Sequence, residues 1–204
     1  MTSNIKAIVF DFGGVLLDWN PRNLYRRYFP DNPEAMEQFL AEINFMEWNV
    51  HQDKGRPFKE GVAILSNQYP QYSRHIQAYY ETWEESVAGE IPGAVEILNR
   101  LKRKGFPLYG LSNWSVETFP ATRRKYPFFE LFDDMVVSGY INLIKPDPAI
   151  FKLLLKKIGR PAHECLLIDD SDINVSIACA LGFVTFQFQT PALLNTELTQ
   201  LGVL

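Results

Sequence analysis

The chain has 204 residues, and its 47% hydrophobic and 22% charged residues are typical of one globular domain, or of one core domain with a small insert. A net charge of −4 gives no electrostatic reason to expect a nucleic acid or an anionic membrane surface as partner. No apolar run approaches the length of a membrane span, and Met1 to Lys6 do not look like a secretion signal. Cys165 and Cys179 stand in apolar surroundings, so we expect two reduced core cysteines in a cytoplasmic protein.

Short, nearly continuous apolar runs recur along the chain and predict strands that are buried on both faces, as in parallel sheets. They cover residues 5–10, 106–111, 135–137, 165–168 and 183–188. Apolar stripes with helical spacing separate most of these runs, and each ends near a glycine that can cap a helix, at residues 92–105, 150–159 and 175–182. Because strands and helices alternate, the sequence predicts an α/β core with a parallel sheet.

Residues from about 21 to 90 follow a different pattern, in which no strand is clear. Apolar residues between positions 58 and 69 fall on one helical face, and prolines punctuate the stretch. We interpret it as a small helical domain inserted after the first strand and its turn. The predicted core therefore comprises residues 1–18 and 91–204, and the predicted helical domain comprises residues 19–90.

Polar and charged residues stand where the predicted strands end, which is the edge at which open parallel sheets bind ligands. Each has an ordinary explanation by itself, as a helix N-cap, a turn residue or a surface charge. Together, however, converging carboxylates would repel one another, and Mg²⁺ is the simplest ion to neutralise them. A lysine and a hydroxyl beside them can hold an anion, so the set favours phosphoryl transfer through a carboxylate nucleophile. These residues are Asp11, Ser112, Asn113, Lys145, Asp169 and Asp170.

Four short segments resemble, in order and spacing, the motifs of the haloacid dehalogenase-like hydrolases: FDFGGVL, LSNWS, KPDPAIF and LLIDDSDIN. The resemblance covers nearly the whole chain and implies a Rossmann-like core with a helical cap domain that closes over the substrate. It implies Asp11 as the catalytic nucleophile that forms an aspartyl intermediate. Ser112 and Lys145 would be catalytic as well, and together with Asn113 would bind the substrate. The implied Mg²⁺ ligands are Asp11, the backbone carbonyl of Gly13 and Asp170. Asp169 would either bind the ion directly as well or support Asp170 without touching the ion.

The resembled family contains both Mg²⁺-dependent phosphatases and metal-free dehalogenases of 2-haloacids, which use the same aspartate nucleophile. The adjacent acids Asp169 and Asp170 favour a phosphatase, because a metal-free site would leave their repulsion uncompensated. The dehalogenases carry an arginine in the cap, and no arginine stands between Tyr28 and Gly55. The segment LSNWS leans slightly toward the dehalogenases. We predict a phosphatase of a small phosphorylated metabolite, such as a sugar phosphate, with a dehalogenase and a non-catalytic binding module as the alternatives.

Gly13 departs from the family pattern, because most of the phosphatases have an aspartate there that protonates the leaving oxygen. Without that acid, the enzyme should favour aryl or anomeric phosphates over primary alkyl phosphates. A glycine at this place can also simply relax a tight turn. Asp18 and His51 are alternative candidates for the proton donor. The candidates for substrate contact in the cap, which the sequence does not rank, are Arg22, Arg26, Trp48, His51 and Trp83.

Overall fold

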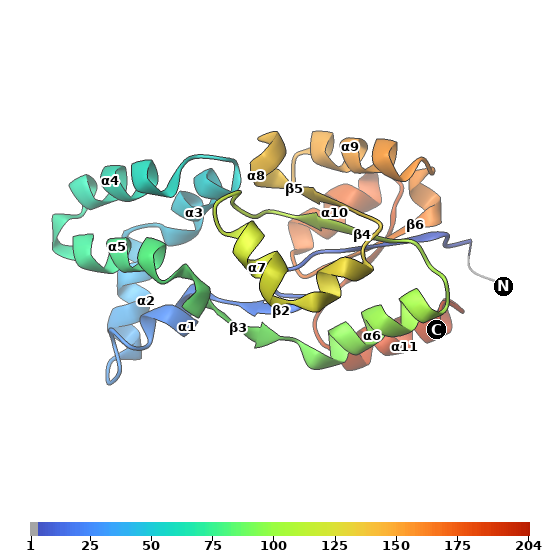
Figure 1. Ribbon diagram of the computed structural model, residues 1–204, viewed down its shortest axis with the longest axis horizontal. Helices are drawn as coiled ribbons and strands as arrows, with labels where there is room; N and C mark the ends of the chain where they lie inside the picture. Colours follow the sequence, from blue (N-terminus) through green and yellow to red (C-terminus); the bar gives the residue numbers. More distant parts are fainter. Residues whose placement is uncertain (1–3) are drawn as a thin grey trace.

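The central element is a five-stranded sheet, which the computed structural model shows within residues 4–204, the part of the chain that it describes. The strands follow the order β5-β4-β1-β6-β7, and every neighbouring pair is parallel. Helices lie on both faces of the sheet (Figure 1). The predicted α/β fold with a parallel sheet is therefore confirmed. The strands are β1 (Ala7–Phe10), β4 (Leu108–Ser112), β5 (Asp134–Val137), β6 (Cys165–Asp169) and β7 (Val184–Gln187).

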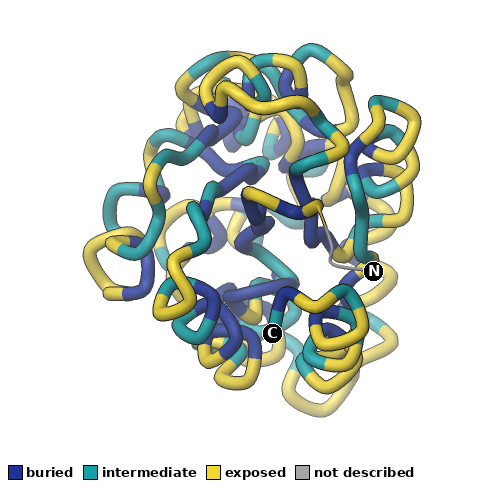
Figure 2. The backbone as a smooth tube through the Cα atoms, turned by 90° about the vertical axis from the view of Figure 1, so that its right-hand side faces the viewer, coloured by how far each residue is buried: buried dark blue, intermediate teal, exposed yellow. Residues whose placement is uncertain are grey.

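The side chains of β1 alternate between two hydrophobic clusters, one on each face of the sheet. Ile8 and Phe10 pack with the helices α6 and α11, whereas Ala7 and Val9 pack with α9 and α10. Burial on both faces explains why this strand reads as a continuous apolar run. Figure 2 shows the buried stretches gathered in the interior. The four helices are α6 (Pro92–Arg103), α9 (Pro148–Ile158), α10 (Asp172–Ala180) and α11 (Pro191–Gln200).

The predicted proline start of α6 and the predicted glycine end of α9 are both present, and α9 also begins with a proline. Both α6 and α9 begin with a proline, whose missing N–H would have no helical partner in the first turn. At the other end of α9, Gly159 has a φ of 69°, a left-handed conformation that glycine adopts without strain. The shorter core helices are α7 (Phe119–Lys125), η3 (Pro127–Leu131), α8 (Ser138–Ile141) and η4 (Ala162–Glu164).

A helical segment, residues 21–86, lies at one end of the molecule, on the left in Figure 1. Aromatic rings fill its interior: the ring of Tyr25 lies 4.9 Å from that of Phe39, and the ring of Tyr79 lies 4.8 Å from that of Phe45. The aromatic richness of this stretch therefore serves packing in the first place. Its helices are α1 (Pro21–Tyr25), α2 (Pro33–Glu42), α3 (Phe45–Asp53), α4 (Phe58–Gln68), η1 (Pro70–Tyr72), α5 (Ser73–Glu81) and η2 (Trp83–Ser86).

Two short strands, β2 (Leu17–Trp19) and β3 (Val87–Glu90), connect the helical segment to the core as an antiparallel pair. The prediction that residues 21–90 contain no strand is wrong for β3. Its four residues are too few to show a period, and their pairing partner is distant in sequence. The domain limits remain a prediction: the limit at 18/19 falls inside β2 and the limit at 90/91 follows β3. Residues 1–3 lie outside the described residues. They belong to the predicted core and to the stretch that was compared with a secretion signal.

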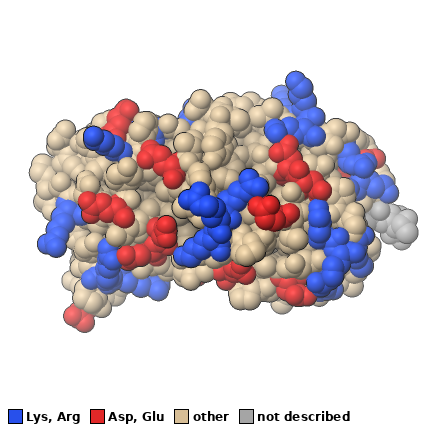
Figure 3. Space-filling view, in the orientation of Figure 1, with Lys and Arg blue, Asp and Glu red and all other residues tan. Residues whose placement is uncertain are grey.

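The surface carries mixed charge, and Figure 3 shows basic and acidic side chains intermingled over the face in view. No helix between residues 4 and 204 is long and apolar enough to cross a membrane. Both cysteines are free, but Cys165 is buried and Cys179 is exposed, so the prediction of two core cysteines is wrong for Cys179. Its neighbour Ala178 faces the sheet, and one residue along a helix turns the side chain by about 100°.

Candidate active site

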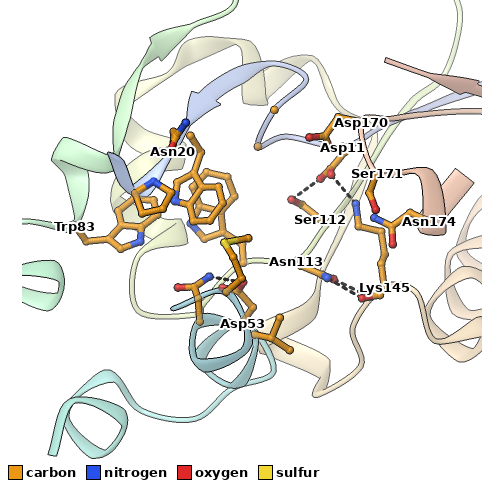
Figure 4. Close-up of a pocket in the computed structure, with 18 of the residues that line it drawn as sticks. Asp11, Asn20, Asp53, Trp83, Ser112, Asn113, Lys145, Asp170, Ser171 and Asn174 are labelled. Atoms are coloured by element: carbon orange, nitrogen blue, oxygen red, sulfur yellow. Dashed lines mark hydrogen bonds and ion pairs between the residues drawn. The ribbon is translucent and has the colours of Figure 1, made fainter. Parts of the chain in front are cut away.

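The ends of the parallel strands bring the predicted site residues to one edge of the sheet. Asp11 follows β1 directly, and Ser112 and Asp169 are the last residues of β4 and β6. Lys145 comes from the loop before α9, and its side chain reaches the same edge. Figure 4 shows Asp11, Ser112, Lys145 and Asp170 around one end of a cavity. The structure therefore assembles residues that lie far apart in the sequence.

Lys145 forms the electrostatic centre of this group. Its Nζ lies 2.8 Å from Oδ2 of Asp11 and 2.6 Å from Oδ2 of Asp169, and only 1% of its side chain is exposed. Burial lowers the pKa of this ammonium, but the charges of Asp11 and Asp169 outweigh burial and raise the pKa overall. Asn113 fixes the backbone of Lys145 through two hydrogen bonds, of 2.8 Å to its N–H and 2.9 Å to its carbonyl. Lys145 is thus a fixed buried cation, and the surface-charge explanation is wrong.

Asp11 is held through its other carboxylate oxygen, Oδ1. This oxygen accepts a hydrogen bond of 2.7 Å from the backbone N–H of Phe12 and one of 2.7 Å from the hydroxyl of Ser112. Burial raises the pKa of Asp11 to about 7; Lys145 lowers it, while the charges of Asp169 and Asp170 raise it. One side chain thus meets an ammonium, a hydroxyl and a backbone donor, an arrangement that orients a carboxylate toward the cavity.

Asp169 is fully buried, and both of its oxygens already have partners. Oδ1 accepts hydrogen bonds from the N–H of Ser171 at 2.9 Å and from Nδ2 of Asn174 at 3.0 Å, and Oδ2 accepts from Lys145 at 2.6 Å. Asp170 lines the cavity instead, and its pKa is raised by burial and by the charge of Asp169. The two neighbouring acids therefore differ: Asp169 is enclosed by donors and Asp170 faces the cavity.

The acidic group has the composition of a site for a hard divalent cation. One oxygen each from Asp11, Asp169 and Asp170 lie within 4.8 Å of one another. These three carboxylates face a single ammonium, that of Lys145, so the ionised group carries an excess of two negative charges. Oxygen ligands and this excess charge fit Mg²⁺. The loop residue Gly13 lines the same cavity.

The cavity, of about 380 Å³, extends from this polar end to an apolar part. Among the cap residues considered from the sequence, Arg22 and Trp83 line it, whereas Arg26, Trp48 and His51 do not. Trp48 is buried in the helical segment and donates its indole N–H to the carbonyl of Gly61 at 3.0 Å. The apolar part is formed by Trp19, Pro21, Met46, Val50, Trp83 and Trp114.

Gly13 does not adopt the left-handed conformation that would require a glycine; its neighbour Gly14 does, with a φ of 78°. A Cβ on Gly13 would lie 3.6 Å from Cβ of Trp19 and 3.9 Å from the ring of Trp114, which are ordinary contacts. A Cβ on Gly14 would collide with a carboxylate oxygen of Asp170. The explanation of Gly13 as a relaxed turn is therefore wrong, and the turn depends on Gly14.

Asp53, the last residue of α3, lines the cavity and was not singled out from the sequence. Burial and the negative charge of Asp11 raise the pKa of its carboxyl to about 7, although a hydrogen bond from the backbone N–H of Ser115 opposes the rise. In the sequence, an aspartate before Lys54 and Gly55 reads as an ordinary helix end. No local signal marks it, because the segment bearing it meets the core only in the folded chain.

The chain belongs to the haloacid dehalogenase-like hydrolases, since the sequence model of that family matches residues 5–182. It is similar to a sesquiterpene phosphatase from Aspergillus oryzae, with 27% identity over 98% of each chain. It is also similar to a D-ribitol-5-phosphate phosphatase from Bacteroides thetaiotaomicron, with 25% identity over 96% of this chain and 97% of the relative. A drimenol cyclase from Aspergillus calidoustus is 24% identical and longer, and the chain spans 36% of it.

Solved structures share the fold. An enzyme of the same family from Bacteroides thetaiotaomicron, in complex with magnesium and inorganic phosphate, superposes with a TM-score of 0.67 at 24% identity, covering 91% of this chain and 95% of its own. An L-2-haloacid dehalogenase superposes with a TM-score of 0.67 at 22% identity, covering 89% of this chain and 85% of its own. The predicted Rossmann-like core and the predicted family are thus confirmed. The chain is a hydrolase whose relatives include enzymes named as phosphatases.

Proposed function

We propose that this hydrolase is a Mg²⁺-dependent phosphatase that acts on a small phosphorylated metabolite through an aspartyl-phosphate intermediate. The observation that carries the proposal is the charge of the site, where three carboxylates converge and one buried ammonium pairs with two of them. A divalent cation balances that group, whereas a metal-free dehalogenase would have to tolerate the excess charge. When bound, Mg²⁺ would neutralise the carboxylates and the phosphate oxygens, which lets two anions approach each other.

In the proposed reaction, Asp11 supplies the nucleophilic oxygen. The hydroxyl of Ser112, 2.7 Å from Asp11, and the ammonium of Lys145, 2.8 Å from it, are placed to hold the phosphoryl oxygens beside the nucleophile. Fixed donors of this kind stabilise the charge that develops in the transition state. Asn113 positions Lys145 through its backbone, and Asp169 orients the lysine from behind. Asp170 and the carbonyl of Gly13 would complete the cation site with Asp11.

We also propose that residues 19–90 act as the cap that selects the substrate. This assignment is supported by the part that α1, α3 and η2 take in the cavity wall. The relatives are named for substrates as different as D-ribitol 5-phosphate and a sesquiterpene. Because tryptophans and Met46 line much of the cavity, a leaving alcohol with an apolar part fits it as well as a sugar does. A substrate panel should therefore contain both kinds of phosphate.

The dehalogenase alternative has less support from the cavity. The one arginine among the described residues that line it, Arg22, is paired with Glu37 at 2.5 Å. A paired guanidinium has less charge to offer the carboxylate of a haloacid. The non-catalytic alternative, a binding module, makes one clear prediction that differs from ours: no phosphate ester should be turned over at all.

The test is hydrolysis of a panel of phosphate esters by the wild-type enzyme and by Asp11→Asn, with Mg²⁺ and with EDTA. The amide keeps the shape of the side chain but removes the nucleophile, so phosphate release should fall to background while the far-UV spectrum and the melting temperature show a folded protein. Full activity of Asp11→Asn would overturn the assignment of the nucleophile. Release of chloride from 2-chloropropionate without metal would favour the dehalogenase.

A further inference from the structure

The end of α3, which lines the cavity, is hydrogen-bonded to the core. The hydroxyl of Ser138 donates a 2.5 Å hydrogen bond to the backbone carbonyl of Asp53 and accepts one from the N–H of Trp114 at 2.9 Å. A few residues later, the N–H of Phe58 donates to the carboxylate of Glu117 at 2.7 Å. The helical segment is thus held against the loop after β4, and this contact fixes where Asp53 stands.

The carboxyl of Asp53 is oriented by a chain of hydrogen bonds inside the helical segment. The indole N–H of Trp83 donates to the hydroxyl of Tyr79 at 3.1 Å, which donates to Oδ1 of Asn49 at 3.2 Å. The amide of Asn49 then donates to Oδ2 of Asp53 at 2.9 Å. From the core, the backbone N–H of Ser115 reaches the same carboxyl. Its direction is therefore set from both sides of the interface.

Asp53 lies in the cavity wall opposite the proposed nucleophile. Figure 4 shows it on α3, across the cavity from the group that contains Asp11 and Ser112. The nearby groups that titrate are Asp11, on the core, and Tyr79, on α5. Burial, followed by the charge of Asp53, keeps the pKa of Tyr79 well above its usual value, so Tyr79 remains a neutral donor. Burial, followed by the negative charge of Asp11, raises the pKa of Asp53 to about 7.

Elimination among the ionisable residues that line the cavity leaves Asp53 as the available proton donor. Asp11 is the proposed nucleophile, Asp170 faces the proposed cation, and Lys145 is held by two carboxylates. Arg22 is paired and cannot give up a proton at neutral pH. Asp18 and His51 are exposed and do not line the cavity. Within residues 4–204, the full set of ionisable lining residues is Asp11, Arg22, Asp53, Lys145 and Asp170.

We propose that Asp53, supplied by the helical segment, is the catalytic acid and base that the core lacks at Gly13. The inference rests on the proposed phosphatase function. As an oxygen of Asp11 bonds to phosphorus and the bond from phosphorus to the ester oxygen breaks, the carboxyl of Asp53 gives its proton to that oxygen. The alcohol leaves, and Asp53 is then a carboxylate. In the second half, Asp53 takes a proton from the water that attacks the aspartyl phosphate, which releases inorganic phosphate and restores both aspartates.

The role of Asp53 predicts a characteristic dependence on the leaving group. A positioned general acid contributes roughly 10²–10⁴-fold, and most of this is needed for poor leaving groups. For the wild-type enzyme, single-turnover rates should depend only weakly on the pKa of the alcohol across aryl and primary alkyl phosphates. In Asp53→Asn, single-turnover release of the alcohol should slow by roughly 10²-fold or more for the alkyl phosphates, whereas single-turnover release of p-nitrophenolate should change little, because nitrophenolate leaves without a proton.

Three further variants sharpen the test. Asp18→Asn and His51→Gln change exposed groups outside the cavity and should leave the rates unchanged. Gly13→Asp, combined with Asp53→Asn, offers an acid from the core and should restore part of the alkyl phosphate activity. Rescue confined to poor leaving groups supports a lost proton donor, because a general disturbance of the site would not be repaired by an acid at another position.

Two results would overturn the inference. One is a folded Asp53→Asn in which single-turnover release of the alcohol is slowed equally for all substrates or for none. The other is a steep leaving-group dependence in the wild-type enzyme, which needs no variant and holds even if Asp53→Asn fails to fold. Neither result touches the proposed function, which fails separately if wild-type protein releases no phosphate or if Asp11→Asn stays active.

Discussion

The ammonium of Lys145 lies 2.8 Å from a carboxylate oxygen of Asp11, and the two side chains are only 1% and 10% exposed. Such a pair forms a fixed positive point directly beside the proposed nucleophile. It is also a charge pair withdrawn from water, whose partners depend on each other for neutralisation. Removing either partner should therefore affect stability as well as catalysis, and the two effects need separate measurements.

Lys145→Ala should lower kcat by roughly 10²-fold or more, by analogy with the loss of a single transition-state donor. It should also destabilise the fold by about 3–5 kcal/mol, because Asp11 and Asp169 lose their buried counter-charge. Initial rates below the melting transition and urea denaturation measure the two effects. Lys102→Ala is the matched control, since Lys102 pairs with Asp133 on the surface at 2.9 Å and should change neither quantity much. An unchanged kcat in Lys145→Ala would contradict the assigned role.

Asp170→Ala should raise the Mg²⁺ concentration that gives half-maximal activity, because Asp170 faces the cavity beside Asp11. Direct Mg²⁺ binding to the phosphate-free protein, followed by calorimetry, should weaken in parallel. Asp172→Ala provides the control, since Asp172 is an exposed carboxylate that begins α10 and does not line the cavity. If Asp170→Ala binds Mg²⁺ as tightly as the wild type, the cation lies elsewhere.

The stability of the metal-free protein should depend on pH through Asp53. Its pKa is raised from 3.8 to about 7 in the folded chain, so between these values the folded state binds more protons than the unfolded state. The unfolding free energy therefore falls as pH rises toward 7, by up to about 1.4 kcal/mol per pH unit for one full proton. Asp53→Asn should make this fall shallower between pH 5 and 7 in urea titrations with EDTA, leaving the part that Asp11 contributes through its own raised pKa. Slopes equal to those of the wild type would show that Asp53 titrates normally.

Gly13→Ala and Gly14→Ala form a matched pair. Gly13→Ala should fold with nearly unchanged stability, because its Cβ meets only ordinary contacts and its φ is not left-handed. Gly14→Ala should be destabilised by about 1–2 kcal/mol, because its φ is 78° and its Cβ would collide with Asp170. It should weaken Mg²⁺ binding as well. Denaturation curves and Mg²⁺ titrations compare the two, and equal behaviour would contradict the structural difference between them.

The sequence by itself determined the sheet, its helices and the edge at which the polar residues meet. Strands buried on both faces must be apolar throughout, so β1 and β6 are visible as continuous runs. The residue that ends a parallel strand lies at the ligand edge whatever the details of packing, and this placed Asp11 and Ser112. Both signals are local, which is why single segments of the chain carried them.

Only the tertiary structure decided which groups touch. In the folded chain, Lys145 is buried between two carboxylates and β3 pairs with β2. Cys179 is exposed to solvent, and the left-handed residue of the turn is Gly14 rather than Gly13. It also placed Asp53 in the cavity with Asp11, across an interface between the helical segment and the core. Such contacts depend on how two folded parts pack against each other, and no periodicity within either part encodes that packing.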